Sequence, residues 1–253
     1  MKALIGQMSV EFTLFLRDKA VVFFSLLFPL VTVTFFGYLN RGNQVPVLSE
    51  VEGGTVSYSS FLIAGGIGMV LSSAAFENLS TALARQRDAG ILKRLGGAPL
   101  RAWTLVCAKT LTAATVVLAQ TILLTAVNVL LFGAEITGSV LWSLAVLIVG
   151  VLTFTTMAIA LAGLCRNADV AAAAGLAISL PMQFLCGTFL PVEEMPSLLR
   201  QIARLLPLTY FVDALRGAML VGGGPLKYAQ DWGVLLGCLI VAFVVAVKTF
   251  RWE

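Results

Sequence analysis

The residues with the most chemical character lie in one short stretch, RQRDAGILKRLGGAPLR, between positions 85 and 101. Five basic residues and one acid occupy this stretch, and glycine and proline punctuate it. Charge alone favours an anchor that binds anionic lipid headgroups. The order of a glycine, a short helix, two glycines and a proline instead favours a docking element for a soluble partner, because an anchor needs no defined shape. Both interpretations remain open from the residues alone.

A second group of residues with a possible functional role consists of isolated polar residues inside long apolar runs. Gln120, Asn128 and Gln183 interrupt such runs, and Glu77 stands near the end of another. Polar groups within a membrane are often functional, although hydrogen bonds between helices are the commoner reason for them. We expect such hydrogen bonds at the three amides, with a substrate path as the alternative. For Glu77 we expect an ion pair with Arg85 or Arg87.

Residues that serve catalysis or metal binding are scarce. The chain has no histidine, and its four cysteines are scattered through apolar runs without a C-x-x-C motif. This composition excludes histidine-dependent catalytic triads and histidine metal sites. A G-x-x-x-x-G-K-[ST] loop, which would bind ATP phosphates, does not occur either. We therefore predict no catalytic residue, no metal site and no cofactor in this chain.

The elements that must position these residues follow from hydropathy. Of the 253 residues, 59% are hydrophobic and only 12% are charged, which is too little polar surface for a soluble domain. Long apolar runs without alternation predict helices, because backbone groups cannot stay unpaired in lipid. The sequence thus predicts an all-α integral membrane protein with one domain over 1–253. Its six spans are expected at about 20–40, 58–80, 103–132, 139–164, 169–190 and 231–250.

Loop charges predict the orientation of these spans. With the N-terminus inside, twelve basic residues lie on the inner side and five on the outer side. Both termini and the loop at 81–101 are then cytoplasmic, and the opposite topology is the alternative. The basic residues mark topology rather than nucleic-acid binding. Residues 1–19 predict an amphipathic helix in the inner interface, with a plain extension of the first span as the alternative.

A proline-rich segment before the last span predicts a pair of short outer helices at 191–217. Pro191 and Pro207 bound the first helix, and Glu193, Glu194 and Pro196 stand at its start, as the helix dipole favours. "PLTYFVDALRGAML" predicts the second helix. We expect both helices to lie half buried at the outer interface.

Two motifs resemble those of a known family. "RQRDAGILKRLGGAPL" followed by Lys109 is similar to the first cytoplasmic loop of type-2 ATP-binding-cassette exporter permeases, a group that includes drug, lipid and polysaccharide exporters. "FLCGTFLPVEEMPSLLRQIARLLPLTYFVDALRG" resembles the second hallmark of that group. The two motifs occur in the same order as in the family, and the resemblance covers nearly the whole chain.

The resemblance implies roles for individual residues. Those expected to couple the permease to an ATPase are Arg85, Arg87, Asp88, Gly90, Ile91, Leu92, Lys93, Arg94, Leu95 and Pro99, with Arg166 and Asp169 in a second contact. Those expected in the outer re-entrant helices are Pro191, Glu193, Glu194, Pro196, Pro207, Tyr210, Asp213 and Arg216.

The resemblance also implies the assembly and the activity. Two copies of a soluble ATPase subunit would bind ATP and Mg, and a second permease copy would complete a homodimer or a heterodimer. The expected function is export of an amphiphilic drug, lipid or glycan across the bacterial cytoplasmic membrane by alternating access. A lipid-modifying membrane enzyme and a non-transporting membrane scaffold are the alternatives.

Overall fold

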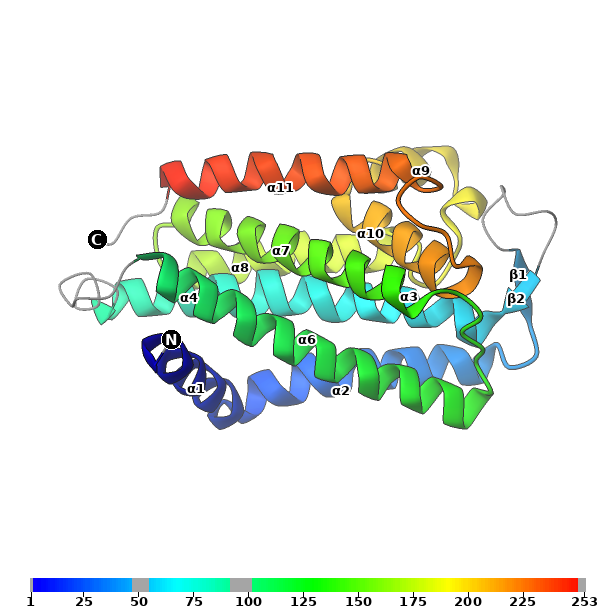
Figure 1. Ribbon diagram of the computed structural model, residues 1–253, viewed down its shortest axis with the longest axis horizontal. Helices are drawn as coiled ribbons and strands as arrows, with labels where there is room; N and C mark the ends of the chain where they lie inside the picture. Colours follow the sequence, from blue (N-terminus) through cyan, green and yellow to red (C-terminus); the bar gives the residue numbers. More distant parts are fainter. Residues whose placement is uncertain (1, 47–54, 92–101, 250–253) are drawn as a thin grey trace.

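A bundle of long helices forms the molecule in the computed structural model, which describes residues 2–46, 55–91 and 102–249 (Figure 1). The elements are α1 (Lys2–Arg17), α2 (Lys19–Leu39), β1 (Gln44–Pro46), β2 (Thr55–Ser57), α3 (Tyr58–Ser72), η1 (Ser73–Leu79), α4 (Ser80–Asp88), α6 (Ala102–Phe132), α7 (Val140–Leu164), α8 (Ala168–Leu185), η2 (Val192–Glu194), α9 (Ser197–Ala203), α10 (Pro207–Arg216), η3 (Gly217–Val221) and α11 (Ala229–Thr249). Strands β1 and β2 pair in antiparallel fashion.

Six helices in the described part of the chain are long and apolar enough to cross a membrane. They are Val21–Leu39, Tyr58–Asp88, Cys107–Phe132, Val140–Leu164, Ala168–Leu185 and Ala229–Thr249. The prediction of an all-α membrane protein is confirmed. The second of these helices runs eight residues past the predicted end of its span (88 − 80), because η1 and α4 continue α3 without a break.

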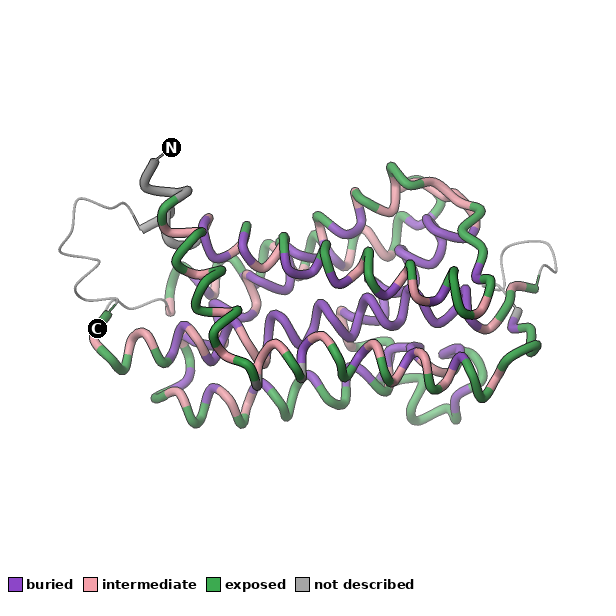
Figure 2. The backbone as a smooth tube through the Cα atoms, turned by 90° about the horizontal axis from the view of Figure 1, so that it is seen from below, coloured by how far each residue is buried: buried purple, intermediate pink, exposed green. Residues whose placement is uncertain are grey.

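Helix α3 and its continuation through η1 form the centre of the bundle (Figure 2). Three glycines in α3 allow three different neighbours to approach. A Cβ at Gly65, Gly66 or Gly68 would lie within 2.7 Å of heavy atoms in, respectively, the segment after α8, helix α2 and helix α10. Real side-chain carbons do not come that close, so a larger residue at any of these positions would push a neighbour away.

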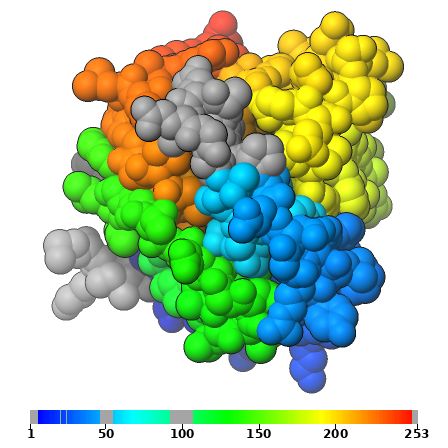
Figure 3. Space-filling view, turned by 90° about the vertical axis from the view of Figure 1, so that its right-hand side faces the viewer, coloured from blue at the N-terminus to red at the C-terminus, as the bar shows by residue number. Residues whose placement is uncertain are grey.

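The bundle has two distinct ends. The N-terminal helix α1, the last turn of α4 and the C-terminal part of α11 lie at one end, which we call the basic end (Figure 1). The hairpin β1–β2, helix α9 and the segment after η3 lie at the other, which we call the outer end, and they cover it together (Figure 3).

Side-chain caps fix where several helices begin and end. Asp18 Oδ1 accepts a hydrogen bond from Val21 N at 3.1 Å, so α2 starts at Lys19 and the chain turns sharply between α1 and α2. Helix α4 ends before Gly90, whose φ of +67° lies in the left-handed region that glycine adopts without strain.

The two predicted outer helices differ in their environment. Helix α9 is exposed along most of its length, whereas every residue from 208 to 216 in α10 is buried among α3, α7 and α11. The prediction that both lie half buried at an interface is therefore wrong for α10. Its buried Arg216 explains the difference, because the guanidinium donates a hydrogen bond to Gly187 O at 2.8 Å and stacks 3.7 Å from the centre of the Phe61 ring.

Candidate functional site

The C-terminal turn of α4 is fastened to the end of α7 by Arg87. Its guanidinium donates hydrogen bonds to Ala162 O at 2.9 Å and to Cys165 O at 2.8 Å. The last carbonyl groups of a helix have no partner within the helix and carry partial negative charge. Arg87 therefore satisfies two such carbonyls, and only 14% of its side chain is exposed.

The neighbouring residue binds the start of α8. Asp88 Oδ2 accepts a hydrogen bond from Ala168 N at 2.7 Å, and Asn167 Oδ1 caps the same helix by accepting from Val170 N at 2.9 Å. A carboxylate at a helix N-terminus is favoured by the helix dipole. Through Arg87 and Asp88, the start of the 81–101 loop is joined to the short loop between α7 and α8. We call these two residues the loop brace.

The other residues predicted to meet an ATPase fall into two groups. Arg85 and Ile91 are exposed near the brace, Arg166 is exposed on the loop between α7 and α8, and Asp169 is exposed in the first turn of α8. These four side chains thus surround the brace at the basic end. The remaining members, Leu92, Lys93, Arg94, Leu95 and Pro99, lie outside the described residues.

A buried ion pair attaches the N-terminal helix to the bundle. Lys109 Nζ lies 2.7 Å from Glu11 Oε1, and the Lys109 side chain is only 2% exposed. Gln86 Nε2 of α4 donates to the same oxygen at 3.3 Å. Glu11 of α1 therefore faces α4 and α6. Sequence reasoning missed the pair, although a lysine near the start of an apolar run was a usable signal.

Glu77 lies among neutral donors rather than beside a cation. Its Oε1 accepts hydrogen bonds from Ser179 Oγ at 2.6 Å and Gln183 Nε2 at 3.2 Å, both on α8, and its Oε2 accepts from Ser73 Oγ at 3.2 Å. The predicted ion pair with Arg85 or Arg87 is wrong. Arg87 is engaged with α7 instead, and about 15 Å of helix separates its Cα from that of Glu77.

The three amides predicted to share a substrate path do not come together. Gln183 is on α8 with Glu77, whereas Gln120 and Asn128 are buried on α6. Asn128 Nδ2 donates to Leu124 O at 2.9 Å, within its own helix. Among the described residues, no group bonds to either polar atom of the Gln120 amide, which lines a small cavity beside Pro29.

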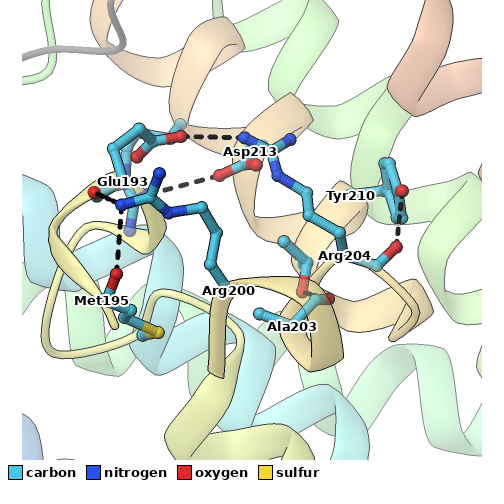
Figure 4. Close-up of polar contacts among 9 residues, drawn as sticks. Glu193, Met195, Arg200, Ala203, Arg204, Tyr210 and Asp213 are labelled. Carbon is cyan, nitrogen blue, oxygen red and sulfur yellow. Dashed lines mark hydrogen bonds and ion pairs between the residues drawn. The ribbon is translucent and has the colours of Figure 1, made fainter. Parts of the chain in front are cut away.

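Charged residues hold the outer helices together at the outer end (Figure 4). Arg204 and Glu193 form an ion pair at 2.9 Å, and the Arg200 guanidinium donates to Met195 O at 3.1 Å and to Glu193 O. Tyr210 donates its hydroxyl to Arg204 O at 2.6 Å, which joins α10 to the end of α9. These contacts make the segment from Pro191 to Arg216 a connected unit.

An internal ion pair lies deeper in the same segment. Asp213 Oδ1 and Arg216 NH1 are 3.5 Å apart, and both side chains are buried. Burial raises the pKa of Asp213 to about 6, although the nearby Arg216 charge opposes that shift. Pro191, Glu194, Pro196 and Pro207, the other residues predicted here, are found in the turns and first helical positions of the unit.

The helices and sites described so far define a multi-pass membrane protein with a braced surface at one end and a re-entrant helical unit at the other. Residues 7–220 match the model of the ABC-2 type transporter family. This match covers well over half of the chain, which therefore belongs to that family. No cluster of three or more metal-ligating side chains occurs in the parts of the chain that the structure describes.

Individual relatives agree with this assignment. The chain is 28% identical over 216 residues to nodulation protein J of Bradyrhizobium diazoefficiens, covering 81% of this chain and 77% of the relative. It is 27% identical over 209 residues to nodulation protein J of Rhizobium leguminosarum bv. viciae, covering 81% and 78%. A protein described as a probable multidrug ABC transporter permease, YbhR of Escherichia coli K12, is 23% identical over 158 residues, covering 62% and 43%.

Family membership fixes the role at a coarse level. The chain is the membrane permease subunit of an ABC exporter and not itself a catalytic enzyme. A permease of this family works with an ABC ATPase subunit. The resemblance seen in the two sequence motifs is thereby confirmed.

Proposed function

We propose that this permease moves an amphiphilic drug, lipid or glycan out of the cell by alternating access. A separate ATPase subunit, present in two copies, binds ATP and Mg and hydrolyses the nucleotide. The ATPase docks on the loop at 81–101 and on the loop between α7 and α8. Closure of the ATPase pair then rocks two permease copies against each other.

The loop brace is the observation that carries this proposal. Arg87 and Asp88 bind the end of α7 and the start of α8, so both expected ATPase contacts are tied to one rigid point. A force applied to either loop is then passed to α4, α7 and α8 together. A lipid anchor would need charge at this surface but no hydrogen bonds between the two loops.

The cargo is proposed from the names of the relatives and the shape of the outer end. One relative is described as a probable multidrug permease, and others are nodulation proteins. The loop between α2 and α3 is short, and β1–β2, α9 and the segment after η3 lie at the outer end (Figure 1). This arrangement favours release of the cargo at the outer leaflet.

The proposed assembly has two permease copies, as a homodimer or a heterodimer with a related chain, in a bacterial cytoplasmic membrane. Both termini and the basic end are then cytoplasmic. The distribution of basic residues in the loops supports this orientation.

Charge reversal in the docking loop tests the proposal. The double variant Arg85→Glu with Lys93→Glu should lower co-purification of the ATPase and abolish ATP-dependent uptake of cargo into inverted vesicles. Arg41→Glu is the matched control, because Arg41 is exposed near the outer end. Membrane insertion, measured by the amount of folded permease, should be the same for all three proteins.

Two outcomes would contradict the docking role. The first is wild-type export and co-purification by the double variant. The second is labelling of a cysteine placed at Lys93 by a membrane-impermeant reagent from the outside of intact cells, which would put the loop on the wrong side.

A further inference from the structure

Glu77 is the one acidic residue of the second span that lies far from both ends of its helix. Eleven residues separate it from Asp88, which corresponds to about 16 Å of helix. Its partner Ser179 is likewise eleven residues from Ala168 at the start of α8. Both helices therefore place the carboxylate at the same distance from the basic end. Glu77 belongs to the predicted span 58–80 and Ser179 to the predicted span 169–190, so the hydrogen bond joins two membrane-spanning segments.

Three neutral side chains orient this carboxylate. Ser179 and Gln183 come from α8 and are fully buried, and Ser73 comes from one turn earlier in η1. We call Ser73, Glu77, Ser179 and Gln183 the Glu77 cluster. Such donors hold the two oxygens in place but bring no positive charge. No lysine or arginine in the described residues forms an ion pair with Glu77.

Two local features of the backbone build the cluster. Residues 73–79 form a π-helical turn, a rare distortion that is frequently found at functional sites. Gly175 on α8 packs directly against the Phe76 carbonyl, where a Cβ would overlap that oxygen. This close approach brings Ser179 and Gln183, one and two turns further along α8, within hydrogen-bond distance of Glu77.

The cluster also lies at the least buried part of the central helix. From Ser59 to Thr81 every residue is buried except Glu77 and Asn78, which are half-buried. Leu176, Leu180 and Phe184 on the adjacent surface of α8 are exposed and apolar. A half-buried acidic residue therefore lies beside exposed apolar side chains, and this combination suits an amphiphilic cation.

We propose that the Glu77 cluster is a binding site for the positively charged group of an amphiphilic organic cation, whose apolar part lies along α8. A half-buried carboxylate without a counter-ion is unfavourable beside lipid, and a cationic ligand lowers that penalty. The three neutral donors keep the carboxylate oriented when the ligand has left. This inference rests on the proposed export function and names the class of cargo.

Equilibrium binding to the purified permease–ATPase complex in lipid nanodiscs, without ATP, tests the site. Rhodamine 6G serves as the cationic dye and Nile red as the uncharged dye, with binding to empty nanodiscs subtracted. Glu77→Gln should raise the Kd for rhodamine 6G at least tenfold and leave that for Nile red within twofold. Glu77→Asp, which keeps the charge, should remain within threefold of wild type for both dyes.

Glu194→Gln is the matched control, since Glu194 is an exposed acid in η2 at the outer end, and it should bind both dyes as wild type does. The proposal is overturned if Glu77→Gln changes neither Kd or both equally, or if Glu77→Asp loses as much affinity as Glu77→Gln. It is also overturned if wild type binds no rhodamine 6G.

A second pair of variants decides the matter if Glu77→Gln does not fold. Ser179→Ala and Gln183→Leu keep the carboxylate but remove a donor, and each should raise the Kd for rhodamine 6G alone by at least threefold; no change in either would overturn the proposal. Because binding is measured without nucleotide, this result is independent of the export function. That function fails separately if the complex shows no ATP-dependent transport of any cargo.

Discussion

The Glu11–Lys109 ion pair gives the sharpest quantitative prediction. Removing one partner of a buried pair costs about 3–5 kcal/mol, because the other charge is left without compensation. The two partners differ, since Lys109 is 2% exposed and Glu11 is 12% exposed. Glu11→Gln strands the deeply buried ammonium and should cost about 3 kcal/mol, whereas Lys109→Met strands a carboxylate that water can reach and should cost about 1.5 kcal/mol.

The double variant separates pairing from packing. With both charges gone, the cost should be about 2 kcal/mol, so the double-mutant cycle gives a coupling energy of about 2.5 kcal/mol. Reversible unfolding in mixed micelles of SDS and dodecyl maltoside measures all four proteins. Arg17→Met, at an exposed position at the end of the same helix, is the control and should stay within about 0.5 kcal/mol of wild type. Additive single effects would refute the reasoning, because the pair would then contribute nothing beyond its separate side chains.

Three further predictions concern the brace, the α8 contact and the outer unit. Arg87→Met should lower ATP-dependent export, and about 2 kcal/mol of stability should be lost because two helix-terminal carbonyls lose their donor; transport assays and micelle unfolding measure both. Gly175→Ala should cost about 1–3 kcal/mol by overlap with the Phe76 carbonyl, seen as a lower unfolding midpoint. Burial raises the pKa of Asp213 from 3.8 to about 6, so the stability that it contributes is full below pH about 4 and is lost as the pH rises through 6. The unfolding midpoint should fall over that range in wild type and not in Asp213→Asn.

Hydropathy and loop punctuation predicted the architecture well because both act locally. Apolar runs specify helices in lipid whatever their neighbours are, so the six spanning helices follow from the sequence. Gly90 follows the end of α4 because glycine has no Cβ and adopts a positive φ without strain, whatever residues surround it. Such features need no knowledge of which helix packs beside which.

Polar partners could not be predicted because they depend on packing between distant segments. Glu77 has Arg85 and Arg87 as its nearest cations in sequence, yet the guanidinium of Arg87 reaches the end of α7. Two of the three hydrogen-bond partners of Glu77, Ser179 and Gln183, are more than one hundred residues away on α8. Likewise, the burial of α10 depends on Phe61 and the Gly187 carbonyl, which no local pattern reveals.

The same physics links the brace to the Glu77 cluster. Helix α4 continues η1 directly, and α8 carries both the Asp88 contact at its first turn and the Ser179 contact eleven residues later. A helix is stiff over this length, so α4 and α8 move as a unit when the brace holds them together. Movement of the docking loops would therefore move the whole Glu77 cluster without changing the contacts within it. The state of the nucleotide would then decide which side of the membrane the Glu77 cluster faces, and the hydrogen bonds within the cluster would stay the same.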